Sequence, residues 1–487
     1  MPTQSLRNKT VHGLGWSAIE NVMKLGISFV ISIVLAWKLS PDEYGLIGIL
    51  MIFISVFNAI VDSGFTNAII RKKDATDVDY STVFYTNLVI SVFMALILFF
   101  CARPISYFFK RDELIPLTQV MSVVVVINAL AIVQRARMTR NIDFKTQTKV
   151  TIISSLVSGI IGIGMAYLGC GVWSLVAQQI SSQLLNTILL WFYNRWVPSL
   201  VFSWSSFREM WTFGWKLLVS CLIDTTWKEI YQVVVGKFYS SATLGLYTRA
   251  KQFSQIFSSN LTSIVQRVSY PVLASIQDDK VRLKYAYQKV IKTTMLPTFV
   301  LMFGMAACAR PMILSLIGEK WIECVPFLQL ICFTGMLYPL HAINLNMLQV
   351  QGRSDLFLKL EIIKKIIAVG PLLLGIFIGI YWMICGSIVN SCIAYYLNAY
   401  YSGPYLNYSI SQQIRDIMPS FLIALIMSIP VYLMSFLPIN CYVLLSLQLI
   451  VGTTIVLSLC EKVQQDEYKE IKHIVLPIMQ KLLKRHG

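Results

Sequence analysis

The chain has 487 residues, of which 56% are hydrophobic and only 13% are charged, and its mean hydropathy is +0.65. A soluble domain carries about 25% charged residues, so this composition excludes a single soluble globule. It also excludes disorder, because too much apolar surface would remain solvated. The remaining class is an all-α polytopic membrane protein. The net charge of +17 would suggest nucleic-acid binding in a soluble protein, whereas in a membrane protein its meaning depends on which side of the bilayer carries it.

Fourteen stretches of the sequence provide the roughly 20 apolar residues that a helix needs to cross the hydrocarbon core. They are predicted at 13–37, 45–66, 82–102, 114–134, 150–168, 172–193, 213–236, 245–268, 292–309, 324–342, 361–381, 383–401, 417–436 and 440–460. The first stretch is not a cleavable signal, because it is too long and carries Glu20 and Lys24. Membrane-spanning strands are excluded, since the alternating pattern of a barrel strand does not recur.

Basic residues are distributed unevenly between the two sets of connecting segments. With fourteen spans both termini lie on one side of the membrane. If that side is the cytoplasm, cytoplasmic segments hold 28 Lys and Arg, external segments hold 8, and 5 lie within spans. This asymmetry follows the positive-inside rule, so both termini are predicted to be cytoplasmic. The same asymmetry explains most of the net charge and argues against nucleic acid as a partner.

The last segment, 461–487, is the largest polar piece of the sequence. Its apolar residues recur near helical spacing, and they are Ile471, Ile474, Val475, Ile478, Leu482 and Leu483. This pattern favours an amphipathic cytoplasmic tail that lies on the anionic inner leaflet. A partner-docking site is the alternative, and Pro477 predicts a break in the helix.

The first and seventh spans begin and end alike. Gly15-Trp16 opens the first, and Gly214-Trp215 opens the seventh. Each ends in a Lys and an apolar residue, followed by a short polar turn and Gly-Leu, which are Gly45-Leu46 and Gly245-Leu246. A duplication explains this and divides the first twelve spans into two lobes of six helices, at 1–200 and 201–402. The thirteenth and fourteenth spans, within 403–460, lie outside the repeat.

Ionisable side chains within the spans are unusual, because each costs about 2.5 to 3.5 kcal/mol at mid-bilayer on insertion scales. Glu20 precedes Lys24 by four residues in the first span, and Asp224 precedes Lys228 by four in the seventh, so each pair shares a helix face. The candidate cavity residues are Glu20, Asn21, Lys24, Asp62, Lys216, Asp224, Lys228 and Arg267.

Two explanations of these charges remain open. The pairs neutralise each other and hold helices together, or they line a hydrophilic cavity between the two lobes. Deep in the spans the cations outnumber the acids, which favours a cavity for an anionic ligand such as phosphate. Amides are candidates to bind sugar hydroxyls there, although individually each is more often a helix-packing hydrogen bond. They are Gln178, Gln179, Gln183, Asn344, Asn346, Asn390 and Asn398.

The sequence carries no motif for a catalytic centre, a metal or a cofactor. There is no GxxxxGK[ST] phosphate loop, and the four His stand at 12, 341, 473 and 486 without the spacing of metal ligands. The ten Cys contain no CxxC pair, so neither a disulfide framework nor a metal site is expected. We therefore expect that the protein is not an enzyme.

Several short motifs, in order along residues 5–400, resemble those of bacterial polysaccharide flippases. They are Leu39-Ser-Pro-Asp-Glu-Tyr-Gly45, Asp62-Ser-Gly-Phe65 with Ile70-Arg71, Leu244-Gly-Leu-Tyr247 with Arg249-Ala250, Tyr270-Pro271 with Gln277-Asp278-Asp279, Leu316-Ile-Gly-Glu-Lys-Trp321, and Gln351-Gly352-Arg353. Each is weak alone, but their order and spacing are specific. The chain is similar to the oligosaccharide flippase branch of the multidrug/oligosaccharidyl-lipid/polysaccharide exporter superfamily, nearest its colanic-acid-exporter-like subgroup of lipopolysaccharide biosynthesis proteins. The last two spans and the tail carry no recognised motif.

The resemblance implies two six-helix lobes around a central cationic cavity and transport by alternating access. The implied cargo is a polyprenyl-pyrophosphate-linked oligosaccharide repeat unit, moved from the inner to the outer leaflet of the bacterial cytoplasmic (inner) membrane for capsule, O-antigen or exopolysaccharide synthesis. Membrane lipids are a further implied partner. H⁺ or Na⁺ as coupling ion and other polysaccharide-assembly membrane proteins as partners stay open, because no coupling-ion site transfers residue by residue.

Two other classes of function are compatible with the sequence. A multidrug/ion antiporter or a peptidoglycan-precursor flippase of the same superfamily would share the fold. A membrane polysaccharide polymerase or ligase is a more distant alternative, because such enzymes typically need a large external loop and every external segment of this sequence is short.

Overall fold

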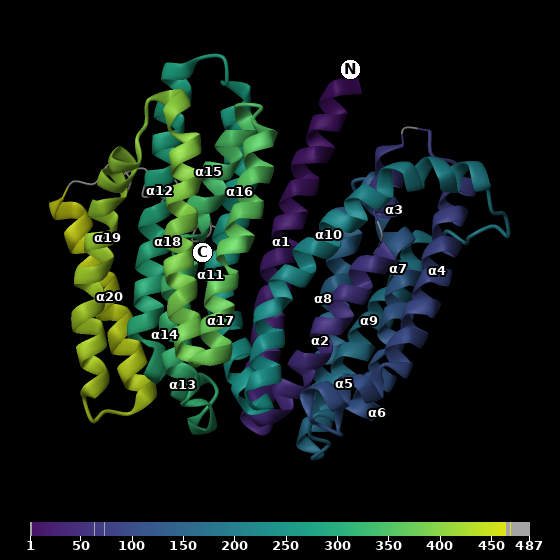
Figure 1. Ribbon diagram of the computed structural model, residues 1–487, viewed down its shortest axis with the longest axis horizontal. Helices are drawn as coiled ribbons and strands as arrows, with labels where there is room; N and C mark the ends of the chain where they lie inside the picture. Colours follow the sequence, from purple (N-terminus) through teal and green to yellow (C-terminus); the bar gives the residue numbers. More distant parts are fainter. Residues whose placement is uncertain (1, 63, 73, 464–467, 469–487) are drawn as a thin grey trace, which may run out of the picture. The chain divides into compact units, whose positions relative to one another are not determined.

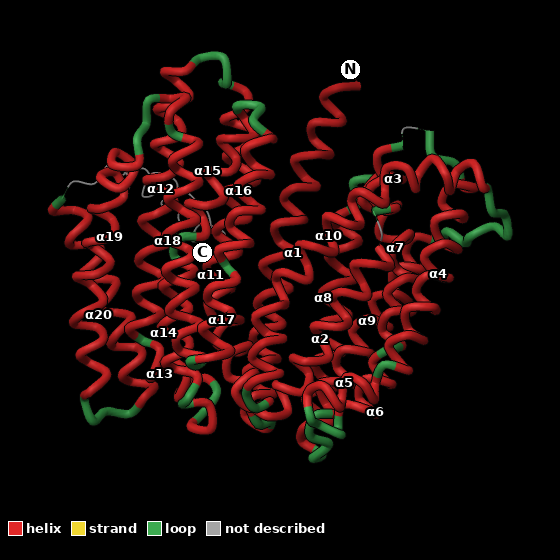
Figure 2. The backbone as a smooth tube through the Cα atoms, viewed as in Figure 1, coloured by secondary structure: helices red, strands yellow, loops and turns green. Residues whose placement is uncertain are grey.

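The computed structural model describes residues 2–62, 64–72, 74–463 and 468. These residues form two compact units, Met1–Gly245 and Leu246–Gly487. The described residues are helices joined by turns and short loops, with no strand among them (Figure 2). The expected all-α class is therefore confirmed. The predicted amphipathic tail at 461–487 lies almost wholly outside the described residues.

Unit 1 is a bundle of long helices with a few short helices among them (Figure 1). Its helices are α1 (Pro2–Lys38), α2 (Pro41–Asp62), α3 (Phe65–Arg71), α4 (Asp77–Phe100), α5 (Ala102–Phe109), α6 (Leu114–Met121), α7 (Val123–Arg140), α8 (Phe144–Tyr167), α9 (Trp173–Asn194), α10 (Trp204–Phe238) and the first turn of α11 (Ser241–Ser275). Helix α8 packs against α1 and α9, α7 packs against α4 and α9, and α10 packs along α2.

Unit 2 contains the rest of α11 and a second bundle. Its helices are α12 (Lys280–Ala307), α13 (Ala309–Leu316), α14 (Cys324–Gly335), α15 (Tyr338–Val350), α16 (Ser354–Ile367), α17 (Val369–Phe377), α18 (Ile380–Ser402), α19 (Ile410–Leu433) and α20 (Cys441–Lys462). Three 3₁₀ turns accompany them, at Glu319–Trp321, Pro404–Leu406 and Met434–Phe436. Helix α19 packs along α12, and α20 packs on α19 and α13, so the two helices beyond the predicted repeat belong to the core of this unit.

Each of the fourteen predicted spans falls on one long helix or on two consecutive helices. Among the described residues, nine such elements are long and apolar enough to cross a membrane. They are Pro41–Asp62, Asp77–Phe100, Leu114–Arg140, Phe144–Tyr167, Lys280–Ala307, Cys324–Val350, Ile380–Ser402, Ile410–Phe436 and Cys441–Lys462. The other five predicted spans lie on α1, α9, α10, α11 and the pair α16–α17, which carry more polar or charged residues. The number fourteen stays a prediction.

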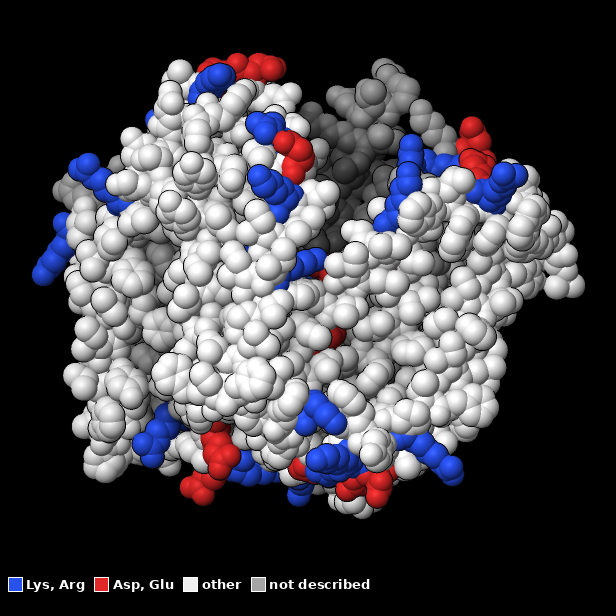
Figure 3. Space-filling model, viewed as in Figure 1, with Lys and Arg blue, Asp and Glu red and all other residues white. Residues whose placement is uncertain are grey.

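The outer surfaces of the long helices are apolar, as contact with lipid requires. On α4 the exposed side chains include Val89, Phe93 and Phe100, and on α20 they include Leu449 and Ile450. On the face seen in Figure 3, most charged side chains gather toward the helix ends, and a mostly uncharged surface separates them. The chain is thus a multi-pass membrane protein.

The structure adds a second repeated motif. The tetrapeptide Cys-Ala-Arg-Pro occurs at Cys101–Pro104 and again at Cys308–Pro311. Both copies end a long helix and begin a helix of eight residues, α5 in unit 1 and α13 in unit 2. In both copies the Cys amide donates back into the long helix, to the carbonyl of Ile97 in one and of Gly304 in the other.

A later turn in each unit repeats as well. The α7–α8 turn contains Ile142 and the α15–α16 turn contains Gly352, 210 residues later, and both residues have positive φ, 59° and 72°. Each turn closes with a bond from the following amide to a carbonyl five residues back, Asp143 to Met138 and Arg353 to Leu348. These recurrences support a duplication. The lobe boundaries at 200 and 402 and the central cavity remain predictions.

A glycine pair in unit 2 tests the backbone requirement of this turn. A Cβ at Gly352 or at Gly370 would meet no atom within 4 Å, but only Gly352 has a positive φ. We expect Gly352→Ala to lower the free energy of unfolding by about 1 kcal/mol, because an L side chain is strained there. Gly370→Ala, inside α17, should leave it unchanged or raise it by up to about 1 kcal/mol. Thermal unfolding of the purified variants measures both, and equal effects would contradict the assignment.

The two glycines of the first repeat, Gly45 and Gly245, meet in unit 1, where α2 and α11 begin. A Cβ on Gly45 would lie 1.7 Å from the carbonyl oxygen of Ser241, and a Cβ on Gly245 would lie 1.8 Å from that of Pro41. Each glycine is the fifth residue of its helix, so the contact is symmetric: each helix start packs its backbone on the other. The recurrence seen in the sequence therefore marks a place where only glycine fits.

An arginine fixes this contact. Nη1 and Nη2 of Arg111 donate to the two carboxylate oxygens of Asp42 at 2.8 and 2.6 Å, and Nη1 also donates to the Ser241 hydroxyl at 2.5 Å. The Nε of Arg111 donates to Glu113 at 3.2 Å. The hydrogen bonds and charge of Arg111 lower the pKa of Glu113, so this acid stays ionised at neutral pH.

Replacement of Gly45 tests the close approach. Gly45→Ala should lower the free energy of unfolding by about 1 to 3 kcal/mol, because its Cβ collides with a backbone carbonyl and not with a flexible side chain. Gly164→Ala is the matched control, since a Cβ at this position in α8 meets nothing within 4 Å. Denaturation of the two purified variants side by side measures the difference, and a Gly45→Ala protein as stable as the control would refute the contact.

Candidate functional site

Unit 1 contains an open polar cavity of about 340 Å³ lined by residues of α1, α7, α8 and α9. Its walls carry hydroxyl, amide and charged groups with little apolar surface. The lining residues are Glu20, Lys24, Arg135, Gln147, Val150, Thr151, Ser154, Ser155, Ser182, Gln183, Asn186 and Leu190. Charged and polar groups inside a membrane-spanning bundle are costly, so a cavity with this lining is a candidate functional site.

Helix α1 contributes both ionisable residues predicted from its sequence. Glu20 and Lys24 lie four residues apart on the face that packs against α8. The hydroxyl of Thr148 donates to the carbonyl of Trp16 at 3.2 Å, and the hydroxyl of Thr151 donates to the Glu20 carboxylate at 2.9 Å. These two bonds from α8 hold α1 in register, so that Glu20 and Lys24 both face the cavity.

Helix α7 contributes Arg135, whose guanidinium donates to Oδ1 of Asn186 on α9 at 3.1 Å. The Arg135 side chain is exposed and lines the cavity. Glu20 and Asp62 act on Arg135 electrostatically. Within the described part of the chain, however, no carboxylate lies at ion-pair distance from Lys24 or Arg135. The cavity thus holds two cations and one lining carboxylate, an arrangement that favours an anionic ligand.

Two further arginines of α7 point elsewhere and show why Arg135 is distinctive. Arg137 pairs with Asp77 at 2.9 Å, and its guanidinium lies 4.8 Å from the ring centre of Tyr80 and 5.1 Å from that of Trp196. Arg140 donates to the Tyr80 hydroxyl at 2.9 Å. Both are therefore engaged by groups around the start of α4. Arg135 is about 200° around the helix from Arg137 and faces α8 and α9 instead.

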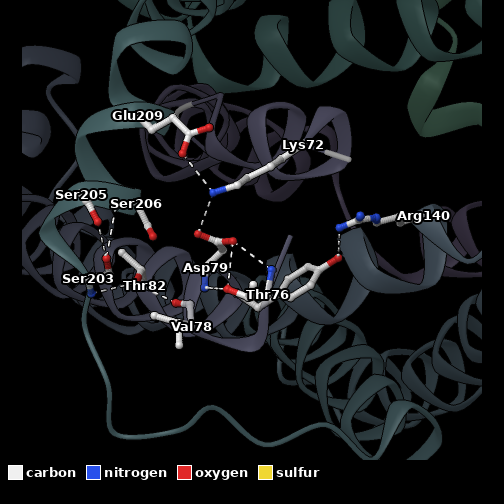
Figure 4. A network of polar contacts seen from close by, with 11 residues as sticks. Lys72, Thr76, Val78, Asp79, Thr82, Arg140, Ser203, Ser205, Ser206 and Glu209 are labelled. Atoms are coloured by element: carbon white, nitrogen blue, oxygen red, sulfur yellow. Dashed lines mark hydrogen bonds and ion pairs between the residues drawn. The ribbon is translucent and has the colours of Figure 1, made fainter. Parts of the chain in front are cut away.

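A second ion network fixes the start of α4 (Figure 4). Asp79, whose side chain is 3% exposed, accepts from Lys72 at 3.0 Å and from the backbone and hydroxyl of Thr76 at 2.8 and 3.0 Å. Lys72 also pairs with Glu209 of α10 at 2.9 Å. Burial acts to lower the pKa of Lys72, but the hydrogen bonds to Glu209 and Asp79 outweigh it and raise the pKa above its usual value. This network positions α3, α4 and α10 and lies outside the cavity lining.

A chain of amides connects the cavity wall to the rest of unit 1. The Gln183 amide donates to Oδ1 of Asn128 at 2.8 Å, and the Asn128 amide donates to Oδ1 of Asn58 at 3.1 Å. Three helices, α9, α7 and α2, are linked in this way. Gln183 thus combines the two roles considered for amides within the spans. Its hydrogen bond links two helices, and its side chain lines the cavity.

The structure brings together only part of the predicted set of site residues. Glu20 and Lys24 line the cavity, and Asp62, at the end of α2, is exposed and accepts a hydrogen bond from the Thr66 hydroxyl. Asn21 is exposed and lies outside the lining, because it is one residue and about 100° away from Glu20 on the helix.

The residues predicted on the seventh and eighth spans lie elsewhere. Lys216, Asp224 and Lys228 are exposed on α10 and do not line this cavity, and Asp224 pairs with Lys228 at 2.6 Å. Arg267 stands on α11, and its side chain lies outside the described residues. The contribution of these four residues to a central cavity stays a prediction.

Arg135 and the hydroxyl wall were not predicted as site residues. Arg135 directly follows the predicted span 114–134 and belongs to the 28 basic residues assigned to cytoplasmic segments. On α8, Gln147, Thr151, Ser154 and Ser155 recur at the period of a helix face and all line the cavity. These four residues were predictable from the sequence, because polar residues at the period of a helix face stand out within an otherwise apolar span.

Comparison with known proteins agrees with this architecture. The pattern of the family described as "Polysaccharide biosynthesis protein" matches residues 34–326. The fold is shared with solved transporters: a lipid II flippase MurJ in an inward closed conformation superposes with a TM-score of 0.72, at 14% identity, over 93% of this chain and all of that one. An inward-facing multidrug resistance MATE family transporter of the MOP superfamily gives 0.60, at 14% identity, over 79% of this chain and 94% of that one.

The chain belongs to the polysaccharide biosynthesis protein family. Among its relatives, succinoglycan biosynthesis transport protein ExoT of Rhizobium meliloti (strain 1021) is 27% identical over 339 residues, which are 69% of each chain. Lipopolysaccharide biosynthesis protein WzxC of Escherichia coli (strain K12) is 25% identical over 377 residues, 76% of each chain. Teichuronic acid biosynthesis protein TuaB of Bacillus subtilis (strain 168) is 26% identical over 384 residues, 77% of this chain and 78% of TuaB.

Proposed function

We propose that this protein is a flippase that moves a lipid-linked oligosaccharide repeat unit across the membrane. The observation that carries the proposal is the cavity of unit 1, where Lys24 and Arg135 stand among hydroxyl and amide groups, with no carboxylate of the described residues at ion-pair distance. Family membership and a fold shared with known transporters support transport in place of catalysis. The groups of the cavity match the polar part of such a substrate, whose phosphates are anionic and whose sugars carry hydroxyls.

The chemistry divides the substrate into two parts. Phosphate oxygens accept charge-assisted hydrogen bonds from Lys24 and Arg135, which a neutral sugar would not need. Sugar hydroxyls both donate and accept, as do Gln147, Ser182 and their neighbours on α8 and α9. The lipid tail needs no cavity, because it remains in the bilayer. A cavity of about 340 Å³ has room for a phosphorylated sugar but not for a long chain.

The cargo, the direction of transport and the membrane are assigned from the chemistry of the cavity and from the names of the relatives. The cargo is a polyprenyl-pyrophosphate-linked unit, moved by alternating access from the inner to the outer leaflet of a bacterial inner membrane, with both termini in the cytoplasm. Its product serves capsule, O-antigen or exopolysaccharide synthesis. ExoT and WzxC, by their names, act in succinoglycan transport and lipopolysaccharide biosynthesis, and this favours a polysaccharide precursor over a peptidoglycan precursor or a drug.

Substitution of the two cavity cations tests the proposal. Lys24→Ala and Arg135→Ala should each reduce the initial rate of flipping at least about tenfold, since a hydrogen bond to a charged group contributes roughly 1.5 to 3 kcal/mol. The measurement uses liposomes that contain the purified protein and a labelled polyprenyl-pyrophosphate oligosaccharide, and it follows the substrate that reaches the opposite leaflet.

The control is Arg415→Ala, which removes an exposed arginine of α19 that does not line the cavity. It should flip at the rate of the unsubstituted protein. If both cavity variants flip at this rate as well, the cavity is not the substrate site. Flipping of lipid II, or of a cationic drug, in preference to the oligosaccharide would assign one of the alternative transport functions.

A further inference from the structure

The connection between α9 and α10 exposes apolar side chains although it lies outside the predicted spans, which end at 193 and resume at 213. Five of its side chains are between 47% and 94% exposed, and we call them the apolar platform. They are Val197, Leu200, Val201, Phe202 and Trp204. Apolar side chains gathered on a surface in this way mark a site of interaction. A connection that simply crossed water would have polar residues at these positions.

Polar hydrogen bonds fix the other side of the connection to α4. The Ser81 hydroxyl accepts from the backbone amide of Ser199 at 3.0 Å, and the Thr82 hydroxyl accepts from that of Ser203 at 3.1 Å. The Ser203 side chain accepts from the backbone amide of Ser206 and so caps α10. Figure 4 shows these hydroxyl groups at the start of α4. The serines are thus used in holding the connection in place, and the apolar platform is left facing outward.

The first turns of α10 extend the apolar surface with stacked rings. Trp204, Phe207 and Trp211 follow at intervals of three and four residues on one helix face, with ring centres 5.0 and 6.0 Å apart. Phe65 of α3 packs against this row, 5.8 Å from Phe207 and 5.9 Å from Trp211. Figure 1 shows the start of α10 beside α3, with the connection at the rim of unit 1. The row is therefore anchored on unit 1, while Trp204 and Trp211 remain exposed.

The residue types indicate what the exposed surface contacts. Five of the eleven tryptophans in the sequence stand at 191, 196, 204, 211 and 215, on both sides of the connection. Tryptophan concentrates where the hydrocarbon core of a membrane meets the headgroups, because its ring is apolar and its N–H is polar. The clustering therefore favours the membrane interface over water.

The charges of the segment agree with a lipid surface. Arg195 and Arg208 are exposed, and no carboxylate of the described residues lies at ion-pair distance from either. Glu209, between them and α3, is already paired with Lys72. Guanidinium groups placed in this way bind lipid phosphates. The tail 461–487 fits the platform less well, because six basic residues outnumber its four acidic ones.

The backbone of the connection limits how deeply it enters the membrane. Residues 195–203 are not helical. Irregular backbone exposed to lipid does not occur in the hydrocarbon core, because its amides and carbonyls would lack partners there. Water and phosphate in the headgroup region supply such partners. The side chains of the platform reach the first acyl carbons from this level.

We propose that residues 195–211 form an interfacial anchor, in which the apolar platform inserts at the headgroup–acyl boundary and Arg195 and Arg208 bind lipid phosphates. The leaflet is the one on the side of the α9–α10 connection, which is cytoplasmic in the topology proposed above. The anchor fixes the start of α10, and α3 and α4 with it, at the membrane surface. This inference concerns the bilayer and not the cargo, so it stands apart from the proposed flippase function.

The test measures the depth of the platform in a bilayer. A fluorescent amino acid replaces Leu200, the most exposed platform residue, in full-length protein in lipid nanodiscs of phosphatidylcholine and phosphatidylglycerol. Matched reporters replace Asp74, an exposed acid of the α3–α4 loop, and Leu449, an exposed residue of α20. The quenchers are iodide in water and lipids that carry a nitroxide at acyl carbon 5 or carbon 12.

Each reporter has its own expected pattern. The carbon-5 lipid should quench the Leu200 reporter at least twice as strongly as the carbon-12 lipid, and iodide should quench it at least threefold less than the Asp74 reporter. The Leu449 reporter should respond most to the carbon-12 lipid. Because Leu200 is exposed, the reporter itself should not disturb folding.

A double substitution tests the side chains of the platform. Phe202→Ser with Trp204→Ser removes two apolar groups, so iodide quenching of the Leu200 reporter should rise at least threefold. Tyr107→Ser is the control, because Tyr107 is 88% exposed on α5, beyond the opposite end of α4. It should leave the quenching of the Leu200 reporter unchanged.

The outcomes decide the proposal. A Leu200 reporter that iodide quenches as strongly as the Asp74 reporter lies in water, and one that no quencher reaches lies under protein, such as the tail or another copy of the chain. Stronger quenching by the carbon-12 lipid places it in the hydrocarbon core. Each of these results overturns the interfacial anchor, as does a double-serine variant that quenches like the unsubstituted protein.

Discussion

A polar side chain inside a membrane-spanning bundle must find a partner in the protein, because the bilayer offers none. This constraint sorts the charged residues of unit 1. Arg137 is held by Asp77 and two aromatic rings, and Asp224 and Lys228 hold each other. Lys24 and Arg135 are different, because their charges face an open polar cavity. Arg137, Asp224 and Lys228 thus have partners within the chain, whereas Lys24 and Arg135 are placed to bind a ligand that the chain does not contain.

The same requirement applies to the backbone where helices begin. The starts of α2 and α11 approach so closely that the carbonyls of Ser241 and Pro41 occupy the space of a Cβ on Gly45 and Gly245. Arg111 then binds Asp42 and Ser241 across this contact. The glycines allow the approach, and the arginine fixes its geometry. The repeated sequence pattern thus has a physical cause. The starts of α2 and α11 pack on each other symmetrically, so each needs a glycine where the backbone of the other approaches.

Much of the fold was predictable, because hydropathy and repeats report directly on spans: all fourteen predicted stretches fall on helices. The site was predictable in part. Glu20 and Lys24 were found because a charge pair within an apolar stretch is visible in one dimension. Arg135 could not be found in this way. Arg137 and Arg140 stand within the same two turns of α7, and only the position of α4 determines which of these arginines form ion pairs or hydrogen bonds with it. Likewise the sequence could not show that Asp224 and Lys228 pair with each other, since the four-residue spacing permits pairing without requiring it.

The cavity of unit 1 places its own demand on the chain. Anion binding by Lys24 and Arg135 needs fixed charges, which Thr151 and Asn186 support by holding Glu20 and Arg135 in place. The hydroxyls and amides of the wall thus position the charged groups as well as lining the cavity.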